Sequence, residues 1–353
     1  MTQAKPERSE GDQRARGRAE GEPERSEGDQ RARGRAEGEP VHPLPPSPVP
    51  APRISSRNEL TLRLLTAAVL VPSVLYAVAK GGLWVLGFVI ALVLLGIREF
   101  YQLIEAKGAH PHWGFGLTAG ALLPVIAFFG NEYQVTMLMT AVLLAVMVAQ
   151  VGKAEISEAL ASISGTFLGI FYVGWLLSHA VTLRNFQRVA AAKWGADAGA
   201  LYDPDAGAFF LIFCLCAVVL SDAGAYFAGR AWGRRKLAPS ISPGKTVEGA
   251  LGGVALGTLG ALLCKGLFDL RWPALSSGLS WGFAAVLGVV LSVVAILGDL
   301  VESLLKRDAA QKDAGQLLPG MGGVLDRIDS ALLAIPVLYY LLLGATYLRA
   351  GFR

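Results

Sequence analysis

The sequence predicts an all-α, polytopic integral membrane protein of about nine transmembrane helices, preceded by a disordered N-terminal tail. Three observations carry this prediction. The 353 residues are 53% hydrophobic and only 17% charged, whereas soluble domains are about a quarter charged. Nine apolar segments approach the roughly 20 residues that a membrane-spanning helix needs. A polar tandem repeat precedes them and contains almost no apolar side chain.

The N-terminal tail, residues 1–57, is built on this repeat. The 17 residues Pro6–Glu22 recur unchanged at Pro23–Glu39, and a proline-rich stretch, Pro40–Pro52, follows. Such a segment cannot bury enough surface to offset its chain entropy, so we expect it to be disordered. It is not a signal peptide, because no apolar run appears before Leu60. Its arginines are nearly balanced by Glu and Asp, which favours a solvated tail over one that binds anionic lipid or RNA.

The remaining residues, 58–353, form the predicted membrane domain. Backbone groups inside hydrocarbon must be paired within the protein, so segments of this length imply a helical bundle. We expect helices over Leu60–Ala79, Gly82–Ile97, Trp113–Phe129, Tyr133–Val151, Ala159–Leu183, Ala208–Ser221, Gly249–Phe268, Leu279–Leu300 and Ala331–Leu348. The glycine-rich face that begins at Gly249 suits close helix packing and permits a homodimer without requiring one. The three cysteines lie in apolar segments and are interpreted as buried small side chains.

Basic residues in the links predict the orientation. The links after the sixth and eighth segments lie on one face, because two crossings separate them, and their charge makes that face cytoplasmic. The first link carries Arg230, Arg234, Arg235, Lys236 and Lys245; the second carries Lys306, Arg307, Lys312 and Arg327. The N-terminus then lies in the cytoplasm and the C-terminus outside. Three cations on the predicted outer face oppose this weakly, namely Arg184, Arg188 and Lys193.

Two polar blocks flank the first basic link. Asp222 follows an apolar run, where a carboxylate is costly unless it faces a cavity or a partner; the alternative is a simple helix-end charge. The second block, Ser-Pro-Gly-Lys-Thr at residues 242–246, offers hydroxyls, an ammonium and free amides just before a helix, which suits an anion. It resembles the end of a P-loop only weakly, because the upstream glycine is missing and no strand is expected before it.

The most informative segment is Ser303–Asp329, called the cassette below. It places basic residues, a glycine-rich bend and a carboxylate pair between two apolar segments. Asp299 and Glu302 precede it, three residues apart and therefore on one helix face; Asp326 and Asp329 share a face in the same way. Carboxylates brought together from two helices would suit Mg²⁺, which prefers oxygen ligands and substrate phosphates. The alternative for any single carboxylate is a membrane-interface charge or a helix cap.

The cassette, SLLKRDAAQKDAGQLLPGMGGVLDRID, closely resembles the signature of the phosphatidate cytidylyltransferase (CDP-diacylglycerol synthase) family. That signature combines Ser-x-x-Lys-Arg, Lys-Asp, a Pro/Gly bend, His-Gly-Gly and Asp-Arg-x-Asp. Every part is present except the histidine, whose position is occupied by Met321. The blocks around Asp222 and Lys245 resemble the same family in order and spacing. The resemblance extends from about Asn58 to the C-terminus and leaves out the tail.

The resemblance implies transfer of CMP from CTP to phosphatidate with Mg²⁺ as cofactor, and it leaves open whether a second cation takes part. It implies a multi-pass protein of the inner (plasma) membrane whose active site faces the cytoplasm, with CTP, phosphatidate and membrane lipid as partners. The implied catalytic residues are Asp299, Asp326 and Lys245. The implied metal ligands are Asp299, Asp326, Asp329 and Asp222. The implied substrate-binding residues are Ser242, Thr246, Arg230, Lys306, Arg307, Lys312 and Arg327.

Two other functions are compatible with parts of the pattern. A CTP-dependent lipid kinase of the polyprenol or phytol type would release CDP instead of pyrophosphate. A transporter would place its charges near the bilayer midplane and tend to show paired halves, whereas these polar residues gather at one face. Met321 cannot replace an imidazole as a proton donor, but pyrophosphate is a good leaving group, so we expect activity to persist.

Overall fold

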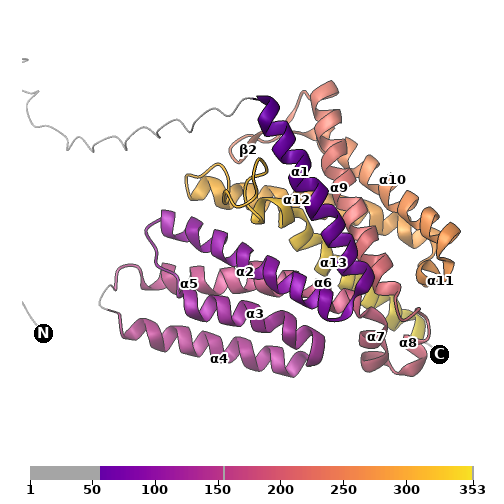
Figure 1. The fold of residues 1–353 in the computed structure, drawn as a ribbon, viewed down its shortest axis with the longest axis horizontal. Helices are drawn as coiled ribbons and strands as arrows, with labels where there is room; N and C mark the ends of the chain where they lie inside the picture. Colours follow the sequence, from indigo (N-terminus) through magenta and orange to yellow (C-terminus); the bar gives the residue numbers. More distant parts are fainter. Residues whose placement is uncertain (1–55, 154–155, 352–353) are drawn as a thin grey trace, which may run out of the picture. The chain divides into compact units, whose positions relative to one another are not determined.

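The computed structural model describes residues 56–153 and 156–351, and these confirm an all-α membrane architecture (Figure 1). Eight helical runs in these ranges are long and apolar enough to cross a membrane. They are α1 (Ser56–Lys80), α2 (Gly82–Ala106), α4 (Glu132–Val151), the run Ala159–Arg184, α9 (Ala206–Trp232), α10 (Val247–Arg271), α12 (Trp281–Asp308) and α13 (Leu325–Ala350). A ninth apolar helix, α3 (Trp113–Phe129), has 17 residues. Of the predicted tail only Ser56 and Arg57 are described, as the start of α1; the repeat lies outside the described residues.

Each of the nine predicted segments contains a helix, but several helices continue past the apolar run. The sixth was expected to end at Ser221, whereas α9 continues to Trp232; the eighth continues from Leu300 to Asp308. Helix hydrogen bonds join backbone groups regardless of side-chain polarity, so an apolar run underestimates helix length. Asp222 and Arg230 therefore stand on the polar continuation of α9, and Lys306 and Arg307 stand on that of α12.

The fifth run is not a uniform helix. It consists of α5 (Ala159–Gly169), a π-helical turn η1 (Ile170–Trp175) and α6 (Leu176–Arg184). Such turns are rare and frequently occur at functional sites. This one carries Tyr172, whose ring packs against Phe100 at 5.9 Å between centroids. The Tyr172 hydroxyl is buried and makes no hydrogen bond with any residue that the structure describes.

Several short elements were not predicted. They are α7 (Phe186–Trp194), α8 (Ala196–Gly199), α11 (Pro273–Ser276), β1 (Lys236–Ala238) and β2 (Ser242–Thr246). The two strands form an antiparallel hairpin that pairs Lys236 with Thr246. The expectation that no strand precedes the Ser-Pro-Gly-Lys-Thr block is therefore wrong. Strands of three and five residues are too short to show the alternating pattern that marks a strand in sequence.

The predicted glycine-rich face packs inside the chain. In α10 a Cβ on Gly253 would lie 2.9 Å from the Ser221 carbonyl oxygen, and one on Gly257 would lie 2.7 Å from that of Ala217. The backbones of α9 and α10 are therefore in direct contact, as small residues at membrane helix interfaces permit. Figure 1 shows these two helices side by side, with α12 next to them.

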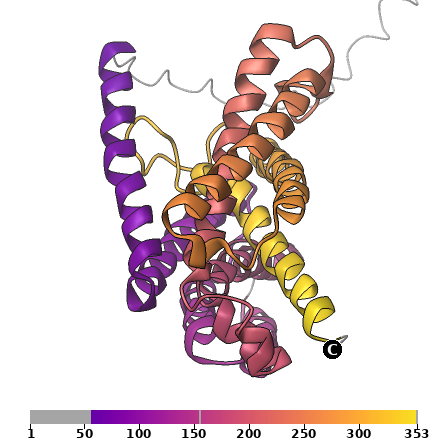
Figure 2. The ribbon, with the colours of Figure 1, turned by 90° about the vertical axis from the view of Figure 1, so that its right-hand side faces the viewer.

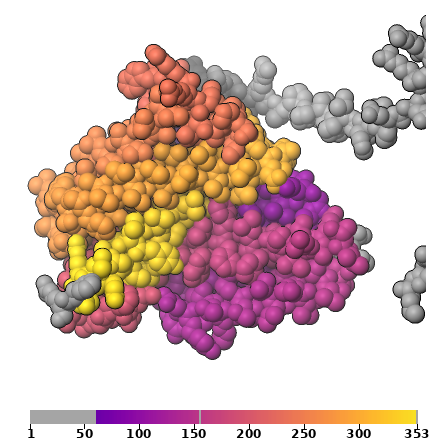
Figure 3. All heavy atoms as spheres, turned by 180° about the vertical axis from the view of Figure 1, so that it is seen from behind, coloured from indigo at the N-terminus to yellow at the C-terminus, as the bar shows by residue number. Residues whose placement is uncertain are grey.

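The helices α13 and α1 occupy contrasting positions. Seen from behind, α13 lies between the orange helices α10 and α12 and the magenta part of the chain (Figure 3), and it contacts both α12 and α6. α1 stands at the edge of the bundle with most of its apolar length uncovered (Figure 2). Its early turns hold the cassette: Arg63 Nε donates to the Gly320 carbonyl (2.9 Å) and Thr66 Oγ1 to that of Pro319 (3.0 Å).

Two of the three cations that opposed the predicted orientation have structural partners. Arg184 is buried and donates to the Val78 carbonyl and to Asp205 Oδ1, each at 2.8 Å. Lys193 pairs with Glu132. Each of these two cations therefore has a structural role within the fold.

Candidate active site

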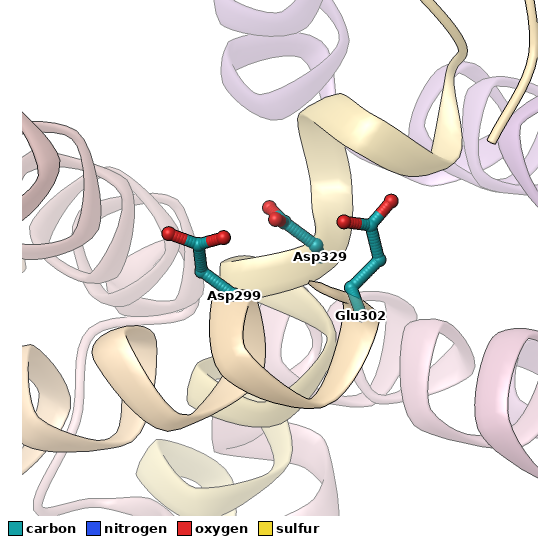
Figure 4. Close-up of side chains that lie close together, drawn as sticks. All are labelled: Asp299, Glu302 and Asp329. Atoms are coloured by element: carbon teal, nitrogen blue, oxygen red, sulfur yellow. The ribbon is translucent and has the colours of Figure 1, made fainter. Parts of the chain in front are cut away.

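Three carboxylates from two helices meet where α12 and α13 touch. Asp299 and Glu302 lie one turn apart on α12, and Asp329 comes from α13 (Figure 4). One oxygen of each lies within 4.8 Å of the other two. Gly298 permits this approach, because a Cβ there would lie 2.8 Å from the backbone oxygen of Asp329. The structure thus groups two of the predicted metal ligands, Asp299 and Asp329, and adds Glu302.

The carboxylate cluster, Asp299, Glu302 and Asp329, holds more negative charge than its surroundings neutralise. Glu302 is fully buried, and it forms an ion pair with Lys306, which also pairs with Asp326. A buried carboxylate costs several kcal/mol unless paired, and neighbouring carboxylates repel one another. Oxygen ligands from several carboxylates are the donor set that hard divalent cations prefer. The cluster therefore fits a divalent cation chemically.

Asp326 lies outside this cluster. Its Oδ1 accepts from Lys306 Nζ at 2.7 Å, and its Oδ2 accepts from the Gly323 N–H at 2.7 Å and from the Ala314 N–H at 3.2 Å. These bonds fold the cassette around the carboxylate. Lys306 also contacts Glu302, so one ammonium links Asp326 to the cluster. In this arrangement Asp326 holds the loop, and its role as a metal ligand stays a prediction.

A cavity of about 440 Å³ adjoins the cluster and collects five predicted site residues. Those five are Asp222, Arg230, Lys245, Thr246 and Asp299; α9, β2, α10 and α12 supply the walls. Lys245 Nζ lies 2.7 Å from Asp299 Oδ2, which ties the hairpin to α12. Because Asp299 belongs to both the cavity wall and the cluster, a molecule in the cavity would lie against Asp299, beside the other two carboxylates.

The hairpin is fixed to the start of α10. Thr246 is the N-cap, and its hydroxyl oxygen accepts from the Gly249 N–H at 3.1 Å. The Glu248 carboxylate accepts from the backbone N–H groups of Arg234 and Arg235. The predicted placement of this block directly before a helix is correct. The positive end of α10 accordingly opens at the cavity.

The other predicted substrate-binding residues lie away from the cavity. Arg327 donates twice to the Met321 carbonyl, at 3.0 and 2.6 Å, and so closes the glycine-rich bend. Arg307 Nε reaches the Ile241 carbonyl of the hairpin turn at 3.4 Å. Lys312 is exposed and makes no ion pair with a described residue, and Ser242 begins β2 without lining the cavity. Contact of these residues with substrate stays a prediction.

Two buried residues near the site escaped the sequence analysis. Tyr172 stands on a helix remote in sequence from the cluster. Its hydroxyl nevertheless lies close enough to interact electrostatically with Glu302, Asp329 and Asp299. Glu99 of α2 accepts from backbone N–H groups at the start of α13. A signal for Glu99 existed: it is an acidic residue at the end of a membrane helix, where ionisable side chains are usually functional. The predicted segment stopped two residues short of it, at Ile97.

Together, the helices and the site define a polytopic membrane protein. Its carboxylate cluster is suited to bind a cation and lies beside a cavity lined by Lys245. The model of the cytidylyltransferase family matches residues 61–344. A phosphatidate cytidylyltransferase of Synechocystis is 33% identical over 293 residues, which cover 79% of this chain and 95% of that protein. Those of Brucella suis and Bacillus subtilis are 32% and 39% identical, covering 82% and 50% of this chain and 95% and 56% of the relatives. The chain belongs to the cytidylyltransferase family and is a nucleotidyltransferase.

Proposed function

We propose that this protein transfers CMP from CTP to phosphatidate. An oxygen of the phosphatidate phosphate attacks the α-phosphorus of CTP, and the bond from that phosphorus to the bridging oxygen breaks. CDP-diacylglycerol forms and pyrophosphate leaves. The observation that carries the proposal is the position of Asp299, which lies in the carboxylate cluster and also lines the cavity beside Lys245. Relatives aligned over 95% of their length carry the name of this activity.

Asp299, Glu302 and Asp329 are the residues that would hold Mg²⁺. The fit rests on their shared approach and on the burial of Glu302, which shares the Lys306 ammonium with Asp326. When bound, Mg²⁺ would neutralise charge on the reacting phosphates and on the pyrophosphate. Asp222 on the cavity wall and Asp326 beside Lys306 are the candidates for a second cation.

Cationic and hydroxyl groups of the chain would bind the phosphates in the cavity. Arg230 presents a guanidinium that can engage two phosphate oxygens at once. Lys245 places an ammonium beside the cluster, where it can exchange Asp299 for a phosphate oxygen. Thr246 accepts one bond as N-cap and keeps its hydroxyl hydrogen for donation. The start of α10 adds its N-terminal dipole to the same anion site.

We place the cavity at the cytoplasmic face of the inner membrane. The basic residues of both links lie at the helix ends that carry the site, and such an excess marks the cytoplasmic side. Fewer basic residues, among them Arg184 and Lys193, lie at the opposite end. CTP then arrives from water and phosphatidate from the bilayer. A scan of cysteine accessibility in spheroplasts tests the orientation.

The activity is tested with radiolabelled CTP, phosphatidate and Mg²⁺ in detergent. We expect labelled CDP-lipid and one pyrophosphate for each molecule formed. Release of CDP together with phosphorylated lipid would instead identify a lipid kinase. A transporter would give neither product, so the absence of both would overturn the proposal.

A further inference from the structure

A buried glutamate outside the cassette caps the helix that carries two of the site carboxylates. Glu99 near the end of α2 is only 4% exposed. Its Oε1 accepts from the Val324 N–H at 3.0 Å and its Oε2 from the Leu325 N–H at 2.7 Å. No side chain at the start of α13 caps that helix locally. A carboxylate from a distant helix therefore satisfies N-terminal amides of α13 and complements its dipole.

The cassette is shaped to receive this carboxylate. A Cβ on Gly315 would lie 2.4 Å from Glu99 Oε1, and a Cβ on Gly323 would lie 2.5 Å from Glu99 Oε2. Neither glycine has the positive φ of Gly320 and Gly322, so backbone conformation does not require glycine there. The two glycines instead leave room for the Glu99 side chain between them. Both sides of the loop close on it.

The bonds of Glu99 connect directly to the site. Leu325 precedes Asp326, which binds Lys306, Gly323 and Ala314; Asp329 follows one turn later in the carboxylate cluster. We propose that Glu99 is a positioning residue that fixes the first turn of α13 and so aligns Asp326 and Asp329 with α12. Its effect on turnover rests on the proposed function; the anchoring of the loop does not.

The proposal is tested by hydrogen exchange of the full-length protein in detergent, for Glu99→Gln and Glu99→Ala. Both changes remove charge, and glutamine also turns an N–H toward a backbone donor. We expect faster exchange over residues 313–329 and unchanged exchange in α9 and α10. Turnover should fall by about 10- to 100-fold, as for residues that orient metal ligands. Half-maximal turnover should also need a higher Mg²⁺ concentration. Unchanged exchange in the cassette would overturn the proposal.

A double-mutant cycle with Gly315→Ala keeps the test independent of folding losses. The three atoms nearest to a Cβ at Gly315 all belong to Glu99, so the two changes act on one contact. We expect Gly315→Ala to accelerate cassette exchange in the wild type but to add little in Glu99→Ala. Gly344→Ala on α13, with nothing within 4 Å, is the matched control and should change neither background. If the effects of the two changes on cassette exchange were strictly additive, the proposal that Glu99 anchors the loop would be wrong. If the wild type forms no CDP-lipid, the proposed function fails while the exchange data still decide the role of Glu99.

Discussion

Charged side chains are buried at both ends of the helix bundle, but the two ends balance them differently. At the end away from the site, Lys265 is buried and its ammonium lies 2.9 Å from both oxygens of Asp269. Ser276 donates to the same carboxylate. Arg184 pairs with Asp205 in the same region of the fold. Lys265 and Arg184 thus each meet one carboxylate.

The site end has a surplus of carboxylates. Four of them share two lysines: the acids are Asp299, Glu302, Asp326 and Asp329, and the bases are Lys245 and Lys306. A matched pair stabilises a fold without a ligand, whereas unbalanced buried carboxylates must be neutralised by a proton or by a bound cation. The comparison teaches that charge balance, and not burial alone, separates a structural pair from a ligand site.

Removing one carboxylate from the cluster should have the largest effect on turnover. We expect Asp299→Asn and Asp329→Asn each to lower kcat on the order of 100- to 1,000-fold, because each removes charge that acts on the transition state. Folding should persist, since repulsion in the cluster falls. CDP-lipid formation and circular dichroism measure the two quantities. Asp308→Asn, at the exposed Lys107 pair on the same helix, is the control and should stay active. Full activity of both cluster variants would remove them from the site.

Mg²⁺ should stabilise the site end alone. A cation that binds only the folded state at 100 times its Kd contributes about 2.7 kcal/mol, so the wild-type Tm should rise with added Mg²⁺ and fall with EDTA. We expect Asp329→Asn to lose this response and Asp269→Asn to keep it. Thermal unfolding in detergent gives the comparison. An equal response from both variants would place the cation elsewhere.

Breaking the Lys265–Asp269 pair should lower stability and leave turnover unchanged, the reverse of the effect expected in the carboxylate cluster. Asp269→Asn leaves the buried Lys265 ammonium without its anion, and we expect a loss of about 1–3 kcal/mol in stability. The turnover of the folded fraction should remain that of the wild type. Tm and specific activity, measured on the same preparation, separate the two effects. A selective loss of activity would show that this end also serves the reaction.

The smallest effect is expected at the position where the cassette departs from the family signature. Met321 contributes its backbone carbonyl to Arg327, and its side chain is not needed for that contact. We expect Met321→His to change kcat by less than about tenfold, below the range of typical acid–base catalysis. A hundredfold increase in an assay with CTP and phosphatidate would make the position catalytic.

Hydropathy predicted the helices because each membrane span is long and continuous, and spacing predicted that Asp299 and Glu302 share a face. It could not be predicted that Asp329, and not Asp326, lies beside Asp299. Both lie on one face of α13, and only the tertiary contacts of Lys306 and Gly323 assign Asp326 to the loop. The role of Glu99 depends on contacts more than 200 residues away, which no local pattern encodes.

The glycine face of α10 has a practical consequence for studies of assembly. That face is occupied by α9 of the same chain, so in the folded protein it is not offered to a second copy. An α10 peptide studied alone in a bilayer would expose the whole stripe and could self-associate strongly. Reporter assays on the isolated segment would then detect an affinity that the intact protein has already satisfied within itself. A homodimer of the full chain would have to form through other surfaces.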